Sequence, residues 1–320
     1  MSQPAPRRFI LLRLGYCHLK NVRGFKLLCQ AARAEHMETT NIQEAAATVC
    51  DVLWIPFSYV PPMAFPNAKR IIYGPHNFVF PFGGWTRLDL RGDSRVSYNC
   101  LSEWNRGVVR KSLEGTAANY PLCTLPFPVD TEDFRPKTIE KSLDCFVYFK
   151  KRRPEHLEAV LDTLKRLSID LGRGLSYVVL KYGSYKEEDY KDVLAAARYG
   201  IWVGCHEPQG FALEEALSCN VPLVVWDAAK MGDEWNESVS RPEYGEEEGA
   251  HVATSIPYWS GECGLVVKEA DELMTALRAM NVLYTSYCPR DFVLRTLSPR
   301  ACAARWLEGE AEVPSKIGPA

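Results

Sequence analysis

The segment that decides the fold runs from Gly204 to Val225 and reads GCHEPQGFALEEALSCNVPLVV. A strand is expected to end at Gly204, a Pro-Gln-Gly turn follows, and a helix opens near Phe211. The next strand is predicted over 222–226. Gly210 lets the backbone approach a ligand closely, and the amides of the helix start carry the positive end of its dipole. This succession of strand, turn and helix predicts a ligand-binding edge of a parallel sheet.

Two carboxylates flank this turn. Glu207 precedes it, and Glu215 lies eight residues later inside the predicted helix. They can reach two different hydroxyl-bearing groups of one ligand, because each carboxylate oxygen accepts hydrogen bonds independently. The alternative is that both are surface glutamates on either side of a tight turn.

Outward from this segment, short apolar runs alternate with helical patterns, which predicts parallel sheets covered by helices. In the first half, helices are expected over 24–36 and 102–112, and strands over 9–14, 52–57, 70–73, 96–101 and 122–126. In the second half, strands with helices between them are expected over 144–149, 175–182, 200–204, 222–226 and 264–267. Residues 228–258 look irregular and acidic, and the length of this stretch indicates a functional or mobile segment.

A proline-rich connector, PFPVDTEDFRP at residues 126–136, separates the two halves. A chain of 320 residues exceeds the usual size of one core. We predict the α/β class, with two doubly wound, Rossmann-like domains that face a cleft. The expected parts are an N-terminal domain (1–128), a linker (129–137), a C-terminal domain (138–298) and a last helix with its tail (299–320) that packs back across the linker.

The composition excludes several classes of protein. With 47% hydrophobic and 24% charged residues, the chain is neither disordered nor a coiled coil. No apolar run approaches the roughly 18 residues of a membrane helix. Eleven cysteines without a C-x-x-C pair predict reduced thiols in the cytoplasm and no structural zinc. The net charge of −2 is too small to require nucleic acid as a partner.

The segment 207–215 resembles the E-x7-E motif of retaining glycosyltransferases of the GT-B fold, the group 1 or family 4-like transferases. Its continuation, EALSCNVPLVV at 215–225, looks like the helix and strand that follow this motif in the family. The connector PVDTEDFRP at 128–136 is similar to the family's "G-V-D-x-x-x-F-x-P" crossover. Asn220 stands where the family usually has glycine, and asparagine tolerates the left-handed conformation of such a turn.

The resemblance implies a glycosyltransferase that moves a sugar from a nucleotide-activated donor to a glycan or another hydroxyl acceptor. Retention of configuration, no metal ion and no cofactor beyond the nucleotide sugar are implied with it. Two alternatives would share the two-domain shape: a catalytically inactive module that binds sugar nucleotides or glycans, and a sugar-nucleotide epimerase.

The resemblance also assigns roles at the central segment. Glu207 would hold hydroxyls of the donor sugar, and Glu215 would hold the ribose of the nucleotide. The backbone around the turn would contact the sugar and the phosphates, and the residues concerned are Gln209, Gly210, Phe211 and Ala212.

A basic cluster, KKRR at 150–153, follows the first strand of the second half. Cations there would neutralise a diphosphate, and Lys150 and Arg152 correspond most closely to the family's Arg and Lys pair. The alternative is a solvated basic cluster. Tyr182 ends the next strand, where it would meet the nucleobase or simply pack against the strand end.

Two residues of the first half complete the expected site. His76 follows the strand 70–73, near a position where the family often has a histidine in contact with a sugar; the alternative is a structural histidine. Gly15 follows the first strand, where the family has a glycine-rich loop against the donor phosphate, but the usual pair of glycines is absent. The expected catalytic set is therefore Glu207, Lys150, Arg152 and His76.

Overall fold

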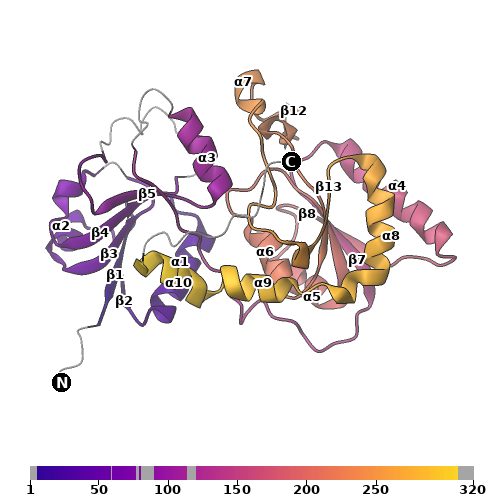
Figure 1. The fold of residues 1–320 in the computed structure, drawn as a ribbon, viewed down its shortest axis with the longest axis horizontal. Coiled ribbons are helices and arrows are strands. Elements are labelled where there is room, and N and C mark those ends of the chain that lie inside the picture. The colour runs from indigo at the N-terminus through magenta and orange to yellow at the C-terminus, as the bar shows by residue number, and fades with distance from the viewer. Residues whose placement is uncertain (1–5, 59, 77–78, 81–89, 114–119, 309–320) are drawn as a thin grey trace. The chain divides into compact units, whose positions relative to one another are not determined.

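The protein is described by a computed structural model that covers residues 6–58, 60–76, 79–80, 90–113 and 120–308. The chain forms two compact units, Met1–Pro128 with Leu297–Ala320, and Val129–Thr296 (Figure 1). Each unit holds its own parallel sheet, which confirms the expected α/β class with two doubly wound sheets. Among the described residues, no helix has both the length and the apolar character needed to cross a membrane.

The first unit is built on a six-stranded parallel sheet in the order β2-β1-β3-β4-β5-β6. The strands are β1 (Arg8–Leu12), β2 (Glu35–Thr39), β3 (Cys50–Ile55), β4 (Ala68–Tyr73), β5 (Val96–Cys100) and β6 (Leu122–Thr124). The helices are α1 (Leu19–Ala31), α2 (Ile42–Ala47), α3 (Glu103–Ser112) and, from the end of the chain, α10 (Pro299–Glu308). The strand order reverses between β1 and β3, and such a reversal opens a crevice at the carboxyl ends of the strands.

Alternate side chains of these strands enter two separate cores, as the pleat of a strand requires. Ile10 packs into the core with residues of α2 and α3. Phe9 points the other way and meets Phe25 of α1, with ring centroids 6.2 Å apart. Trp306 of α10 lies 5.6 Å from Phe25 and 6.2 Å from Trp54, measured between ring centroids. The C-terminal helix therefore completes a core of the first unit.

Two elements near the start of the chain differ from the sequence-based expectation. The helix expected over 24–36 lies five residues earlier as α1, and His36 belongs to β2. This strand lies at the edge of the sheet, and its first four residues are exposed or half-buried. An edge strand of this kind lacks the apolar run by which a buried strand is recognised.

The second unit is built on a five-stranded parallel sheet in the order β13-β10-β9-β7-β8. The strands are β7 (Leu143–Phe149), β8 (Tyr177–Lys181), β9 (Ala197–Val203), β10 (Leu223–Trp226) and β13 (Gly264–Val267). The helices that connect or follow them are α4 (Pro154–Asp170), α5 (Glu187–Ala196), α6 (Phe211–Ser218), α8 (Leu273–Leu283) and α9 (Pro289–Thr296). Here the order reverses between β7 and β9.

The two faces of this sheet are covered by different helices (Figure 1). Val147 packs into a core with residues of α4 and α8. Its neighbour Phe146 points to the opposite face and meets Tyr190 of α5 at 6.4 Å between ring centroids. Apolar residues on both faces explain why the strands of the second unit read as nearly continuous hydrophobic runs.

The stretch 228–258, expected to be irregular, contains short elements. They are β11 (Trp235–Asn236), which pairs with β12 (Arg241–Pro242), and α7 (Glu246–Gly249). Lys230 forms an isolated bridge with Val252, which closes the segment at its base. We call residues 228–253 the insert.

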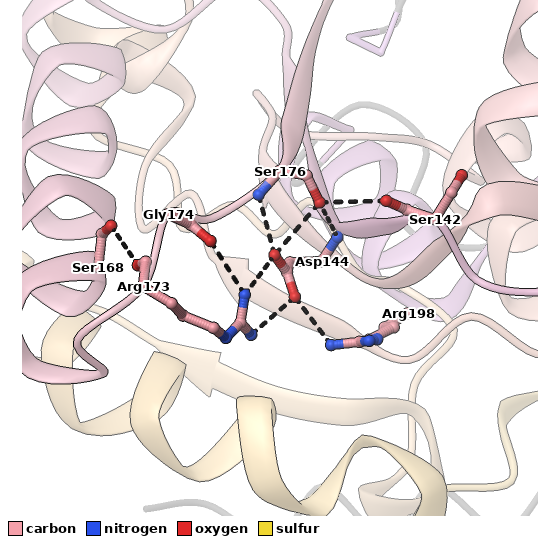
Figure 2. A network of polar contacts seen from close by, with 7 residues as sticks. All are labelled: Ser142, Asp144, Ser168, Arg173, Gly174, Ser176 and Arg198. Carbon is pink, nitrogen blue, oxygen red and sulfur yellow. Dashed lines mark hydrogen bonds and ion pairs between the residues drawn. The ribbon is translucent and has the colours of Figure 1, made fainter.

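At the amino end of the second sheet, Asp144 is the centre of a polar network (Figure 2). Its carboxylate, 6% exposed, accepts hydrogen bonds from the guanidinium groups of Arg173 (2.8 and 2.9 Å) and Arg198 (2.8 Å). The backbone amide of Ser176 donates a further bond at 2.9 Å. Hydrogen bonding to Arg173 is the main cause that lowers the pKa of Asp144 below its usual range.

Candidate functional site

Two turns meet at the carboxyl ends of β7 and β9, where the strand order of the second sheet reverses. The Lys150 amide donates to the Val203 carbonyl at 3.0 Å, and the Cys205 amide donates to the Lys150 carbonyl at 3.0 Å. The sheet pairing therefore continues past the strand ends and holds the turn 150–153 beside the turn 204–210. This is the position at which doubly wound sheets bind ligands.

Lys150 and Glu207 form an ion pair across these turns. Nζ of Lys150 lies 2.6 Å from Oε1 of Glu207, and the two side chains are 16% and 13% exposed. Burial lowers the pKa of Lys150, but the Glu207 carboxylate opposes it, and the net result is a pKa above that of an ordinary lysine. The ammonium group is thus held charged in a largely dehydrated place.

Tyr182 lies beside this pair. Its ring centroid is 4.5 Å from Nζ of Lys150, a cation–π contact, and the residue is 53% exposed. An exposed aromatic ring at the carboxyl end of β8 offers a flat surface to a planar ligand group.

The turn after Glu207 leads directly into the start of α6. Gly210 has φ +96° and ψ +45°, a left-handed conformation that disfavours a side chain. Its carbonyl accepts the amide of Glu214 at 3.0 Å, which closes the first turn of the helix. Phe211 and Ala212 follow as half-buried residues, so the helix start lies within reach of solvent beside Glu207.

Three buried polar residues surround this helix start: Gln209 precedes α6, and Glu214 and Glu215 lie within it. Gln209 is 2% exposed, and its side-chain amide donates to Oε2 of Glu214 at 3.0 Å. Glu214 is fully buried, Oε1 of Glu214 has no hydrogen-bond partner, and burial raises the pKa of this carboxyl well above its usual value. Burial therefore favours the protonated form of Glu214. Glu215 is 5% exposed, so its expected contact with a ribose stays a prediction.

Arg152 has a different environment from Lys150. It is 3% exposed, and its guanidinium donates to the carbonyls of Gly204 (3.1 Å) and Trp226 (3.4 Å) at the ends of β9 and β10. Its Nε is buried without a hydrogen-bond partner, and burial lowers the pKa of the guanidinium. Arg152 thus ties strand ends together, and its expected contact with a diphosphate stays a prediction.

A loop from the end of the insert lines the Glu207 turn. Asp227 accepts hydrogen bonds from the Ser255 amide (2.7 Å) and from the hydroxyls of Thr254 and Ser255. The Thr254 carbonyl accepts the amide of Glu207 at 3.0 Å. The backbone of residues 254–255, which follow the insert, therefore borders the Glu207 turn.

The structure places the two site residues expected in the first half within the first unit. His76 is 8% exposed; its Nδ1 lies 2.9 Å from the Tyr98 hydroxyl, and burial lowers the pKa of its imidazole to about 4. Gly15 follows β1, and a Cβ there would lie 2.7 Å from Cδ1 of Phe57, which follows β3. Gly15 therefore permits close packing where the strand order reverses. The contacts of both residues with a donor stay predictions.

Two buried residues of the site were not expected from the sequence. Glu234, in the insert, contacts Nζ of Lys151 at 2.6 Å and Nδ1 of His206 at 3.1 Å. His206 adjoins Glu207 in the sequence, so its position in the motif could have drawn attention to it. Glu234 had no such signal, because it lies in an acidic stretch without helix or strand periodicity.

No protein-family model matches the sequence, and no curated protein matches it either. Solved structures do resemble the fold. The lipopolysaccharide outer core galactosyltransferase WaaB in its apo form aligns with a TM-score of 0.50 at 10% identity, over 94% of this chain and 98% of that one. The N-terminal domain of Candida albicans trehalose-6-phosphate phosphatase aligns with a TM-score of 0.50 at 13% identity, over 83% and 71%.

A pneumococcal O-GlcNAc transferase, GtfA, in complex with UDP and GlcNAc, aligns with a TM-score of 0.45 at 10% identity over 83% of this chain. The chain spans 57% of the length of that transferase. The two parallel α/β sheets together with the WaaB match establish a two-domain GT-B fold, as expected from the sequence.

Proposed function

We propose that the protein is a glycosyltransferase that moves a sugar from a nucleotide-activated donor to a glycan or another hydroxyl acceptor, with retention of configuration. The observation that carries this proposal is the Lys150–Glu207 pair beside the start of α6, at the strand reversal of the second GT-B unit. A buried cation, a carboxylate and a helix start at one strand edge match the charges of a diphosphate, the hydroxyls of a sugar and the phosphate oxygens.

In the proposed reaction, the bond between the sugar C1 and the diphosphate oxygen breaks and a bond from C1 to the acceptor oxygen forms. The acceptor hydroxyl proton passes to the departing diphosphate. Lys150 and the start of α6 stabilise the charge that grows on the leaving group, while Glu207 accepts hydrogen bonds from the donor sugar. Glu215 holds the ribose, and Tyr182 stacks on the base.

Arg152 has a supporting part in this proposal. Its guanidinium binds the carbonyls of Gly204 and Trp226, so it fixes the strand end from which the Glu207 turn departs.

Lys150 and the helix start supply positive charge where other transferases use a metal ion, so we propose a reaction without metal. Ten of the eleven cysteines are buried thiols, which suits the reducing environment of a cytoplasm.

The first experiment is a thermal-shift screen of nucleotide sugars, followed by mass spectrometry of products with simple glycan acceptors. We expect one class of nucleotide sugar to raise the melting temperature, because a ligand bound only by the folded state stabilises it. Glu207→Gln should keep nucleotide binding but lower transfer about ten- to a thousandfold, as for a lost charged hydrogen bond. Binding of a nucleotide sugar without transfer or hydrolysis by the unaltered protein would favour a binding module instead.

A further inference from the structure

Glu234 links the two turns that carry Lys150 and Glu207. Its carboxylate is 6% exposed; Oε1 lies 2.6 Å from Nζ of Lys151, and Oε2 lies 3.1 Å from Nδ1 of His206. Lys151 directly follows Lys150, and His206 directly precedes Glu207. One carboxylate thus forms an ion pair with the neighbour of Lys150 and packs against the neutral imidazole of the neighbour of Glu207.

The backbone next to Glu234 strengthens its hold on the first turn. The Trp235 amide donates to the Lys151 carbonyl at 2.8 Å. Lys151 has φ +47°, a left-handed conformation that a residue other than glycine keeps only when its surroundings hold it there. The guanidinium of Arg153 also lies 5.0 Å from the Trp235 ring. The insert therefore contacts the turn after β7 in three ways: through the Glu234 carboxylate, the Trp235 backbone amide and the Trp235 ring.

The charges of this cluster balance without a bound cation. Lys150 pairs with Glu207 and Lys151 with Glu234, while burial lowers the pKa of His206 to about 3 and keeps its imidazole neutral. Ligand atoms of Cys205, His206 and Glu234 lie within 4.8 Å of one another, as in a metal site. A divalent cation there would compete with Lys151 for the Glu234 carboxylate. It would also require the Cys205 thiol to ionise, although burial raises the pKa of that thiol.

We infer that Glu234 is a positioning residue: it holds the two turns so that Lys150 and Glu207 face each other at the distance observed. Sheet pairing aligns the turns only as far as Cys205, and the contacts of Glu234 with Lys151 and His206 are the next ones on the two sides. The catalytic consequence rests on the proposed transferase function, whereas the structural consequence does not. The insert thereby sets the geometry of the site although it belongs to neither turn.

The test compares Glu234→Gln with Glu243→Gln. Glu243 lies in the same insert, is exposed, and its carboxylate accepts a hydrogen bond from the Asn236 side chain at 2.7 Å, so it is a control of the same charge. The first measurement is the ¹⁵N–¹H NMR signal of the Lys150 ammonium in the ligand-free protein, assigned by its loss in Lys150→Met. A paired, largely buried ammonium exchanges slowly with water and is therefore visible.

We expect Glu234→Gln to shift or erase the Lys150 signal, although Glu234 does not touch Lys150, and we expect Glu243→Gln to leave it unchanged. Lys151→Gln removes the same link from a side chain that is 45% exposed, so it serves where Glu234→Gln does not fold. An unchanged Lys150 signal in the folded variant overturns the inference. Stoichiometric zinc in the purified protein that Glu234→Gln removes also overturns it.

The second measurement uses the transfer reaction. Glu234→Gln should lower kcat about ten- to a hundredfold with the donor KM within about threefold, because misplaced groups act mainly on the transition state. The double variant with Glu234→Gln and Glu207→Gln should lose no more transfer activity than Glu207→Gln alone. Multiplied losses would show that Glu234 acts independently of Glu207 and would count against the inference. An inactive unaltered protein would remove the transferase proposal, and the NMR result would then decide the inference by itself.

Discussion

The two ends of the second sheet use similar charged residues in opposite ways. At the amino end, both carboxylate oxygens of Asp144 accept hydrogen bonds from arginine or backbone donors (Figure 2). At the carboxyl end, Glu214 has a buried oxygen without a partner and Arg152 has a buried Nε without one. The Asp144 carboxylate is fully bonded, whereas Glu214 and Arg152 at the carboxyl end each keep a buried polar atom without a partner.

This difference indicates that the amino end of the sheet contributes to stability and that the carboxyl end is available for function. A fully satisfied polar network contributes to folding and leaves nothing for a ligand, whereas unsatisfied buried groups cost free energy and are retained mostly at functional sites. Substitutions at the two ends should therefore affect different measured quantities.

The largest effect is expected for Lys150→Met, which removes the cation beside Glu207 and keeps a similar side-chain length. Transfer should fall about a hundred- to a thousandfold, as when a charge-stabilising group is lost, with a smaller change in donor KM. Steady-state kinetics with the donor identified in the screen measure this. Loss of donor affinity with turnover intact would place Lys150 in ground-state binding only.

At the other end of the sheet, Asp144→Asn should lower the free energy of unfolding by about 2–3 kcal/mol. The change leaves two arginines without their carboxylate, but both are partly exposed, so the loss is smaller than for a fully buried pair. Urea denaturation measures the loss. The transfer rate of the folded variant should stay within about twofold of that of the unaltered protein. A large drop would contradict the assignment of stability to the amino end and function to the carboxyl end.

Glu215→Ala tests the proposed contact between the carboxyl end of the sheet and the ribose of the nucleotide. Affinity for the intact nucleotide sugar and for the free nucleotide should fall alike, by about 1.5–3 kcal/mol, because the ribose is common to both ligands. Isothermal titration calorimetry gives both values. Unchanged affinity for the free nucleotide would contradict the ribose contact.

The smallest effect, at pH values below about 4.5, is expected for Glu214→Gln, which resembles the protonated acid. The pKa of Glu214 is raised in the folded state, so its stabilising contribution is complete below the unfolded pKa and is lost as pH rises through the folded pKa. The variant should therefore gain stability relative to the unaltered protein above about pH 4.5, by up to about 1.4 kcal/mol per pH unit. Urea denaturation across pH 4–7 measures the gain, with Glu243→Gln as the control. Parallel pH profiles for the two proteins would show that Glu214 is ionised when folded.

Much of the fold was accessible from the sequence because the central strands of the second unit, β7, β9 and β10, are buried on both faces. β7, β10 and β13 lie within about two residues of the predicted strands, since runs such as 145–149 are apolar throughout. β2 was missed because an edge strand does not need an apolar run. The insert was read as irregular, and its elements of two to four residues are too short to leave a periodic pattern.

The candidate site, like the fold, was predictable from the sequence only in part. The E-x7-E spacing locates Glu207 and Glu215 on either side of a turn, since residues so close in sequence must stay near one another. The spacing does not show that Glu207 pairs with Lys150, 57 positions earlier. Nor does it show that Arg152 points inward while Lys150 meets Glu207.

The sequence by itself determined the two α/β units, the turn at Gly210 and the presence of cations and carboxylates near strand ends. Each of these follows from local patterns: apolar periodicity, a glycine where φ is positive, and residues adjacent in the chain. Only the tertiary structure decided which charges meet, which are buried, and that Glu234 of the insert joins both turns. Pairing and burial depend on the parallel order β9-β7-β8, which brings distant segments to one edge. The free energy of a buried charge is set by those neighbours in space and not by its neighbours in the chain.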